Sequence, residues 1–209
     1  MTLNKKRIAV FASGFGSNLQ AISDYMHNNE VNGYISLVFS NNPEAYALNR
    51  AKKMGIETYV LKPKDFTGRE EYDREIASKI ESEKIDLIIL AGYMLLLTPW
   101  FASRFRNKIM NIHPSLLPSF KGTQGIKDAY EYGVKITGVT VHFVDNELDH
   151  GPIILQEGVN IDDSDTLEDL EEKIHRVEHS LYPKAVEYFC SQRLEIQGRK
   201  VIIRELEKG

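Results

Sequence analysis

The chain has 209 residues, of which 42% are hydrophobic and 27% are charged, and its formal net charge at pH 7 is -4. Such a composition is typical of a globular protein with a full core, and the mild acidity favours neither nucleic acid nor an anionic membrane as the main partner. The single cysteine, Cys190, excludes an intrachain disulfide and favours a reducing compartment.

Short apolar runs alternate with polar stretches of helical spacing in the first half of the chain. Strands are predicted at Arg7–Ala12, Ile35–Ser40, Ile56–Leu61, Asp86–Ala91 and Ile109–Ile112, and helices at Asn18–Asn28, Pro43–Lys53 and Arg69–Ser82. This alternation indicates right-handed βαβ units and a mostly parallel sheet. The first apolar stretch, Ile8–Ala12, is too short for a signal peptide or a membrane span, so we expect a cytoplasmic protein.

The pattern changes after residue 135. Four elements are predicted there: antiparallel strands at Thr137–Val144 and Pro152–Val159, a long helix at Thr166–Phe189 and a hairpin over Leu194–Glu205. Asp165 or Ser164 is expected to cap the long helix, because both side chains accept hydrogen bonds from free N–H groups. Gln197-Gly198 supplies the turn of the hairpin.

The loop after the first strand is rich in glycine and opens a helix. Gly16 permits close approach of a ligand, and the free N–H groups of the helix start suit a phosphate. A dinucleotide site is excluded, because Leu19 stands where the third glycine belongs and no acid follows the second strand. A tight turn capped by Ser17 and a mononucleotide or sugar-phosphate site both remain open.

Asn111 and His113 end a predicted strand. They point the same way because side chains alternate along a strand, and Pro114 and Pro118 then fix the backbone. An amide and an imidazole side by side can hold the oxyanion of a tetrahedral intermediate in acyl transfer. The alternative is a strand-end histidine bonded to backbone.

An acidic loop joins the two late strands and ends at Gly151-Pro152. Asp149 is our candidate partner for His113, since a carboxylate beside an imidazole stabilises the imidazolium and raises the pKa of that histidine. A solvated hairpin loop is the alternative interpretation.

The segment His175–His179 matches a zinc pattern of metalloproteases. We expect no metal, because a catalytic zinc needs a third protein ligand and few residues follow His179. His175 and Glu178 remain candidates for lining a polar pocket.

Taken together, four segments resemble the phosphoribosylglycinamide formyltransferases. The segments are Ser13–Gln20, Ala91–Met94, Asn111–Pro118 and His142–Ile154. The likeness covers nearly the whole chain, and the motifs occur in the order and spacing of that family. It implies transfer of the formyl group of 10-formyltetrahydrofolate to the amine of 5-phosphoribosylglycinamide in purine biosynthesis, with both small molecules as substrates and no metal.

The resemblance also implies a Rossmann-like formyltransferase fold, with a mostly parallel twisted sheet of about seven strands and helices on both faces. We expect one formyltransferase domain over 1–209, in which 1–110 is a phosphate-binding βαβ half and 111–209 is a catalytic and folate-binding half. A cis bond at Leu117–Pro118 is expected as well.

The resemblance assigns a role to each site residue. Asn111, His113 and Asp149 are the implied catalytic residues, Gly16, Ser17 and Asn18 hold the substrate phosphate, and Glu178 contacts the glycinamide substrate. The implied folate site consists of Arg69, Met94, Leu95, Leu96, Leu97 and Asn111 with Val144, Asp145, Asn146, Glu147, Leu148 and Asp149.

The chain departs from the family pattern at Leu95, Lys121 and Gln124, which leaves their substrate contacts open. Two rival functions also stay open: a 10-formyltetrahydrofolate hydrolase, and a non-catalytic module that binds a sugar phosphate. The hydrolases usually carry an extra regulatory domain, for which we expect no room here. A homodimer is left open.

Overall fold

The computed structural model describes residues 4–205. Its internal contacts define two compact units, and the boundary between them falls between Met110 and Asn111, inside strand β5 (Ile109–His113). No helix in the described part of the chain combines the length and the apolar character needed to cross a lipid bilayer.

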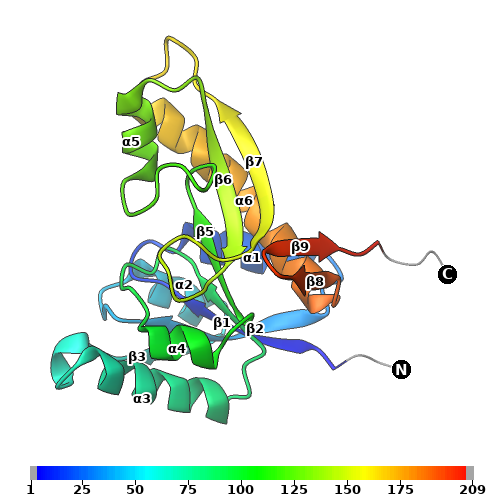
Figure 1. Cartoon of the computed structure of the whole chain (residues 1–209). Helices are drawn as coiled ribbons and strands as arrows, with labels where there is room; N and C mark the ends of the chain where they lie inside the picture. The colour runs from blue at the N-terminus through cyan, green and yellow to red at the C-terminus, as the bar shows by residue number, and fades with distance from the viewer. Residues whose placement is uncertain (1–3, 206–209) are drawn as a thin grey trace. The chain divides into compact units, whose positions relative to one another are not determined.

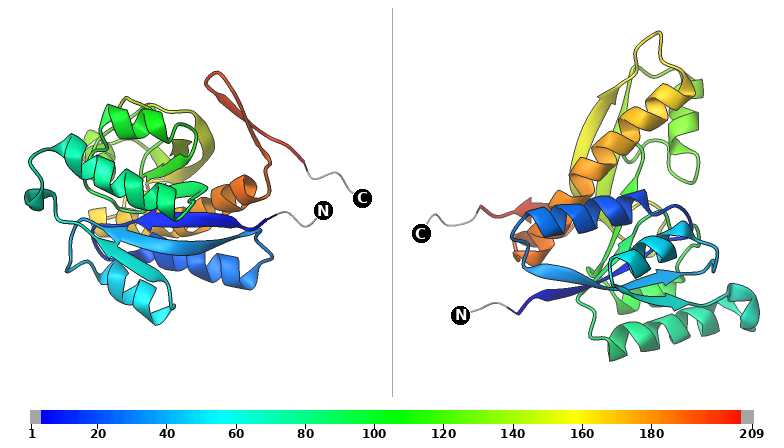
Figure 2. Two further views of the ribbon diagram at one scale, coloured as in Figure 1. Left: turned by 90° about the horizontal axis from the view of Figure 1, so that it is seen from below. Right: turned by 180° about the vertical axis from the view of Figure 1, so that it is seen from behind.

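The first unit contains a parallel four-stranded array in the order β3-β2-β1-β4. Its strands are β1 (Lys6–Phe11), β2 (Gly33–Ser40), β3 (Glu57–Val60) and β4 (Leu87–Leu90). Its helices are α1 (Ser17–Asn28), α2 (Tyr46–Lys53), the 3-10 turn η1 (Pro63–Asp65), α3 (Arg69–Ser82) and α4 (Pro99–Arg104). Figure 2 shows α1 and α2 on one face of these strands and α3 and α4 on the other. All of β4 is buried because helices cover both faces.

The second unit contains the later elements: α5 (Gly125–Tyr132), β6 (Ile136–Phe143), β7 (Ile153–Asn160), α6 (Leu167–Cys190), β8 (Leu194–Gln197) and β9 (Lys200–Ile203). Strands β6 and β7 pair antiparallel, as predicted. Helix α6 packs along both of them, and α5 packs against α6 (Figure 1). The predicted hairpin forms from β8 and β9, and β9 pairs with β7 at Ile153 and Lys200.

Three details differ from the sequence prediction. The described residues form nine strands rather than about seven, because the hairpin strands join the others through β9. Helices α4 and α5 were not predicted. Helix α6 is capped by Thr166, not by Asp165 or Ser164: Thr166 and Asp169 form a reciprocal capping box, which satisfies two backbone N–H groups. The expected cis bond at Leu117–Pro118 is confirmed.

Candidate active site

The glycine-rich loop of the first unit is held tightly at Gly16. Gly16 adopts the left-handed conformation, with φ of 75°, directly before α1. A Cβ atom there would lie 2.7 Å from the Cβ and 2.9 Å from the Cα of Ala47 on α2. Only glycine adopts the left-handed conformation readily and also has no Cβ atom to collide with Ala47. Ser17 is the first helical residue and does not cap α1 with its side chain, so the capping interpretation of the sequence is wrong.

The segment after β4 is tied to the same loop through Ser13. The Ser13 hydroxyl donates to Asn41 Oδ1 at 2.6 Å and accepts the Met94 N–H at 2.8 Å. Arg69 donates to the Leu96 carbonyl at 2.6 Å. The side chains of Met94 and Leu96 are exposed, and those of Leu95 and Leu97 are half-buried. Backbone groups of this segment are therefore fixed in position while the side chains of Met94 and Leu96 face solvent.

In the second unit, Asn111 and His113 lie on the same side of β5, as their spacing predicts. Buried Met110 and Ile112 alternate with them. His113 is 3% exposed, and its Nε2 lies 2.7 Å from the Phe120 carbonyl oxygen, so this nitrogen carries the proton and donates it. The backbone contact that the alternative interpretation proposed for His113 is therefore present.

Asp149 lies beside His113 as well. Its Oδ2 is 3.5 Å from His113 Nδ1 and accepts the Gly122 N–H at 2.8 Å. The residue has a φ of 47°, a conformation that aspartate tolerates better than most side chains. Gly151 fixes the chain just beyond it, because a Cβ atom there would lie 1.8 Å from the Phe143 carbonyl oxygen. The solvated-loop alternative is wrong for Asp149, which is buried.

His142 on β6 completes this group, although no role was predicted for it. Burial lowers the pKa of His142, which outweighs the raising effect of its contact with the Phe143 carbonyl. The ring is therefore neutral: Nδ1 donates to Phe143 O at 2.8 Å, and Nε2 accepts from Asn111 Nδ2 at 3.3 Å. This contact orients the amide of Asn111 and leaves one of its two N–H bonds for a ligand. An ionisable residue in a strand with no other ionisable side chain was the only available signal.

The depressed pKa of His142 predicts a stability effect in acid. Above the unfolded value of 6.5, both states are neutral and the residue contributes nothing. Below it, the unfolded chain binds a proton that the folded chain resists, so stability falls as pH falls. Denaturant unfolding should be measured from about pH 7.5 down to about pH 5. Over this range the free energy of unfolding should fall by up to about 1.4 kcal/mol per pH unit because of this residue.

In the His142→Gln variant we expect that part of the loss to disappear, because glutamine does not titrate. His179 serves as the matched control, because burial also lowers its pKa. His179→Gln should remove its own contribution to the slope of unfolding free energy against pH and leave that of His142 in place. If the slope of unfolding free energy against pH were unchanged in His142→Gln, the conclusion that the His142 ring is neutral in the folded protein would be contradicted.

The remaining predicted residues lie in two places in the second unit. Asp145 accepts the Glu147 N–H at 3.0 Å and contacts His150 Nδ1 at 2.8 Å. Burial alone would raise the pKa of Asp145, but these two hydrogen bonds lower it. On α6, buried Glu178 contacts His175 Nδ1 at 3.1 Å, which raises the pKa of His175.

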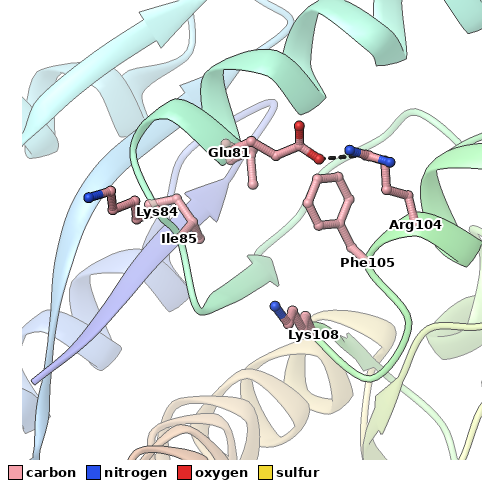
Figure 3. Close-up of a pocket in the computed structure, with 7 residues that line it drawn as sticks. Glu81, Lys84, Ile85, Arg104, Phe105 and Lys108 are labelled. Atoms are coloured by element: carbon pink, nitrogen blue, oxygen red, sulfur yellow. Dashed lines mark hydrogen bonds and ion pairs between the residues drawn. The ribbon is translucent and has the colours of Figure 1, made fainter. Parts of the chain in front are cut away.

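A cavity of about 410 Å³ in the first unit contains none of the predicted site residues. It lies beyond the end of α3, with Lys84, Phe105 and Lys108 in its lining, and an ion pair between Arg104 and Glu81 crosses it (Figure 3). Within residues 4–205, no three His, Cys, Asp or Glu side chains gather as a metal site would require.

Comparison with known proteins decides the family. The profile of the formyl transferase family matches residues 6–186. The chain belongs to the formyl transferase family. A phosphoribosylglycinamide formyltransferase of Escherichia coli (strain K12) is 41% identical over 189 residues, which are 90% of this chain and 89% of that protein. The crystal structure of glycinamide ribonucleotide transformylase 1 from Symbiobacterium toebii is 42% identical, with a TM-score of 0.93, and the match covers 97% of this chain and 95% of that one.

A less similar solved structure has the same fold. The formyltetrahydrofolate deformylase from Pseudomonas syringae pv. tomato str. DC3000 is 28% identical with a TM-score of 0.89, and the match covers 98% of this chain but 67% of that one. The resemblance inferred from the sequence, the Rossmann-like formyltransferase fold and the formyltransferase activity are thereby confirmed.

Proposed function

We propose that this chain transfers the formyl group of 10-formyltetrahydrofolate to the amine of 5-phosphoribosylglycinamide in purine biosynthesis. One observation carries the proposal beyond family membership: half-buried Asn111 and buried His113 and Asp149 form a polar group at the carboxyl end of β5. An amide donor and a histidine paired with a carboxylate are what acyl transfer to an amine requires.

In the proposed reaction, the amine attacks the formyl carbon and the carbonyl oxygen becomes an oxyanion. The free N–H of Asn111 and the Nε2–H of His113 donate to that oxyanion. For His113 to do so, the Phe120 carbonyl, which now accepts from Nε2, must give way. Asp149 faces Nδ1 and stabilises the imidazolium form. A water molecule ordered by Asp149 then carries the proton from the attacking amine to the departing folate nitrogen, so the carbon–nitrogen bond breaks as the proton arrives.

We assign the nucleotide phosphate to Gly16, Ser17 and Asn18. This assignment is supported by the left-handed Gly16, which exposes the N–H groups at the start of α1, where the helix dipole favours an anion. Glu178 is assigned to the glycinamide part of the same substrate, because a buried carboxylate suits an amine.

We assign the folate to the segment Met94–Leu97 with Arg69, to Asn111 and to the loop Val144–Asp149. Backbone groups fixed by Ser13 and Arg69 support the first part of this assignment. A segment that binds through its main chain tolerates Leu95, the position where this sequence departs from the family.

Hydrolysis of the same folate is the second candidate, favoured by the likeness to the deformylase. The greater identity to glycinamide enzymes and the polar group around Asn111 favour transfer instead. The purified chain should release tetrahydrofolate from 10-formyltetrahydrofolate only when phosphoribosylglycinamide is present. Equal release without the nucleotide would establish the hydrolase, and no release in either case would favour a sugar-phosphate-binding module.

We further propose a cytoplasmic location, because Cys190 is a buried free thiol and both substrates are intracellular metabolites. The proposed partners are these small molecules, without nucleic acid. Sedimentation velocity on the purified chain would establish whether it forms a homodimer.

A further inference from the structure

The acidic loop that carries Asp149 is held from outside by the C-terminal hairpin. His150, the next residue, contacts Asp145 Oδ2 through Nδ1 at 2.8 Å. Arg199, at the turn between β8 and β9, contacts the ring and the backbone of the same histidine: Nη1 lies 3.0 Å from His150 Nε2 and 3.4 Å from Nδ1, and Nη2 donates to the His150 carbonyl oxygen at 2.7 Å. A chain of contacts therefore runs from the hairpin through His150 into the loop.

The direction of each hydrogen bond follows from the chemistry of its ends. A guanidinium only donates and a carboxylate only accepts. His150 therefore donates from Nδ1 to Asp145. Nη1 of Arg199 approaches both ring nitrogens, so the guanidinium lies against the ring and holds it in the position from which it binds Asp145. The Oδ1 atom of Asp145 accepts the Glu147 N–H at 3.0 Å, so both oxygens of this carboxylate are used to close the loop.

The position of Asp149 depends on this closure. Its left-handed backbone is unfavourable by itself and persists only where its neighbours determine it. On one side Gly151 is fixed against the Phe143 carbonyl. On the other side His150 is held by Arg199 and Asp145. The hairpin has a firm base for this, because β9 pairs with β7 at Ile153, close to Gly151.

We propose that Arg199 is a positioning residue of the folate site: it acts through His150 to hold the loop Val144–Asp149 in its binding conformation. The inference rests on the proposed function, because it assigns this loop to the folate. A bidentate guanidinium is required, since a lysine at 199 supplies one point contact and cannot reach both atoms of His150.

The test compares Arg199→Ala with Arg204→Ala. Arg204 pairs with Glu195 inside the hairpin and does not contact the loop in the part of the chain described here, so its loss reports on hairpin stability alone. We expect Arg199→Ala to raise the KM for 10-formyltetrahydrofolate roughly tenfold, the size of one ordinary hydrogen bond, and to leave the KM for the nucleotide within about twofold. Arg199→Lys should recover little, and Arg204→Ala should change neither constant.

Hydrogen exchange supplies a readout that does not depend on activity. The amides of Glu147 and Gly122 donate to Asp145 and Asp149, so both should exchange faster in Arg199→Ala and not in Arg204→Ala. His150→Ala should reproduce Arg199→Ala, and the double variant should be no worse than either.

Unchanged exchange and an unchanged folate KM in Arg199→Ala would overturn the inference, as would equal effects of both arginine variants. A wild-type chain without nucleotide-dependent transfer would instead count against the proposed function, and the exchange result would still decide whether Arg199 holds the loop.

Discussion

Replacing Asp149 with asparagine is expected to lower kcat by about a hundredfold or more while the chain stays folded. Asparagine keeps the size of the side chain, can accept the Gly122 N–H and tolerates the left-handed backbone. It removes the negative charge 3.5 Å from His113 Nδ1, so the imidazolium that donates to the oxyanion loses its stabilisation. The measurements are kcat over pH for both proteins, together with their unfolding curves.

Asp163→Asn is the matched control for this experiment. It makes the same change of charge at an exposed position paired with Lys135, and kcat should not respond. Asn111→Ala and His113→Ala should resemble Asp149→Asn, and double variants should be far from additive, because the three residues act as a unit. A near-normal kcat with an unaltered pH profile in Asp149→Asn would show that the carboxylate has no part in the reaction.

The second large effect is expected at Gly16. Gly16→Ala places a methyl group 2.7 Å from the Ala47 Cβ and requires a left-handed alanine. The strain alone costs about 1–2 kcal/mol, and overpacking typically adds about 1–3 kcal/mol. We therefore expect a lower free energy of unfolding and a KM for phosphoribosylglycinamide at least about tenfold higher, because the shifted loop no longer presents its N–H groups to the phosphate.

Gly14→Ala provides the comparison within the same loop. A Cβ atom at Gly14 meets nothing within 4 Å, and its φ is not left-handed, so both the KM values and the stability should stay near wild type. If Gly16→Ala raised the folate KM and spared the nucleotide, the two substrates would have to exchange places in the assignment.

Periodicity predicted the strands well where burial is continuous. The apolar runs of β1 and β4 are recognisable because both faces of these strands are covered. Helix α4 was missed because its six residues give less than two turns, and α5 was missed because it begins at a glycine, which usually marks a turn or loop. The cap of α6 was misplaced because five acceptors in the stretch 162–166 compete, and only the reciprocal bond between Thr166 and Asp169 selects one.

The candidate site was predictable where neighbours in sequence are neighbours in space. Asn111 and His113 share a side of one strand, so their spacing was sufficient. The contacts of His142 with Asn111 and of Arg199 with His150 join residues 31 and 49 positions apart, and no local pattern encodes them. The first contact depends on β5 and β6 being neighbours in the sheet, and the second depends on the path of the hairpin.

The Phe120 carbonyl on His113 has a consequence for how binding energy is used. Phe120 has a φ of 48°, which is strained for an aromatic residue, and its oxygen accepts from the His113 nitrogen that the proposed mechanism assigns to the formyl oxygen. In that mechanism, a neutral substrate carbonyl that replaces the neutral loop carbonyl would gain almost no hydrogen-bond energy from His113. An oxyanion would gain the difference in hydrogen-bond energy between a charged and a neutral acceptor. The proposed exchange would therefore stabilise the transition state but not the bound substrate, and it would raise kcat without tightening substrate binding.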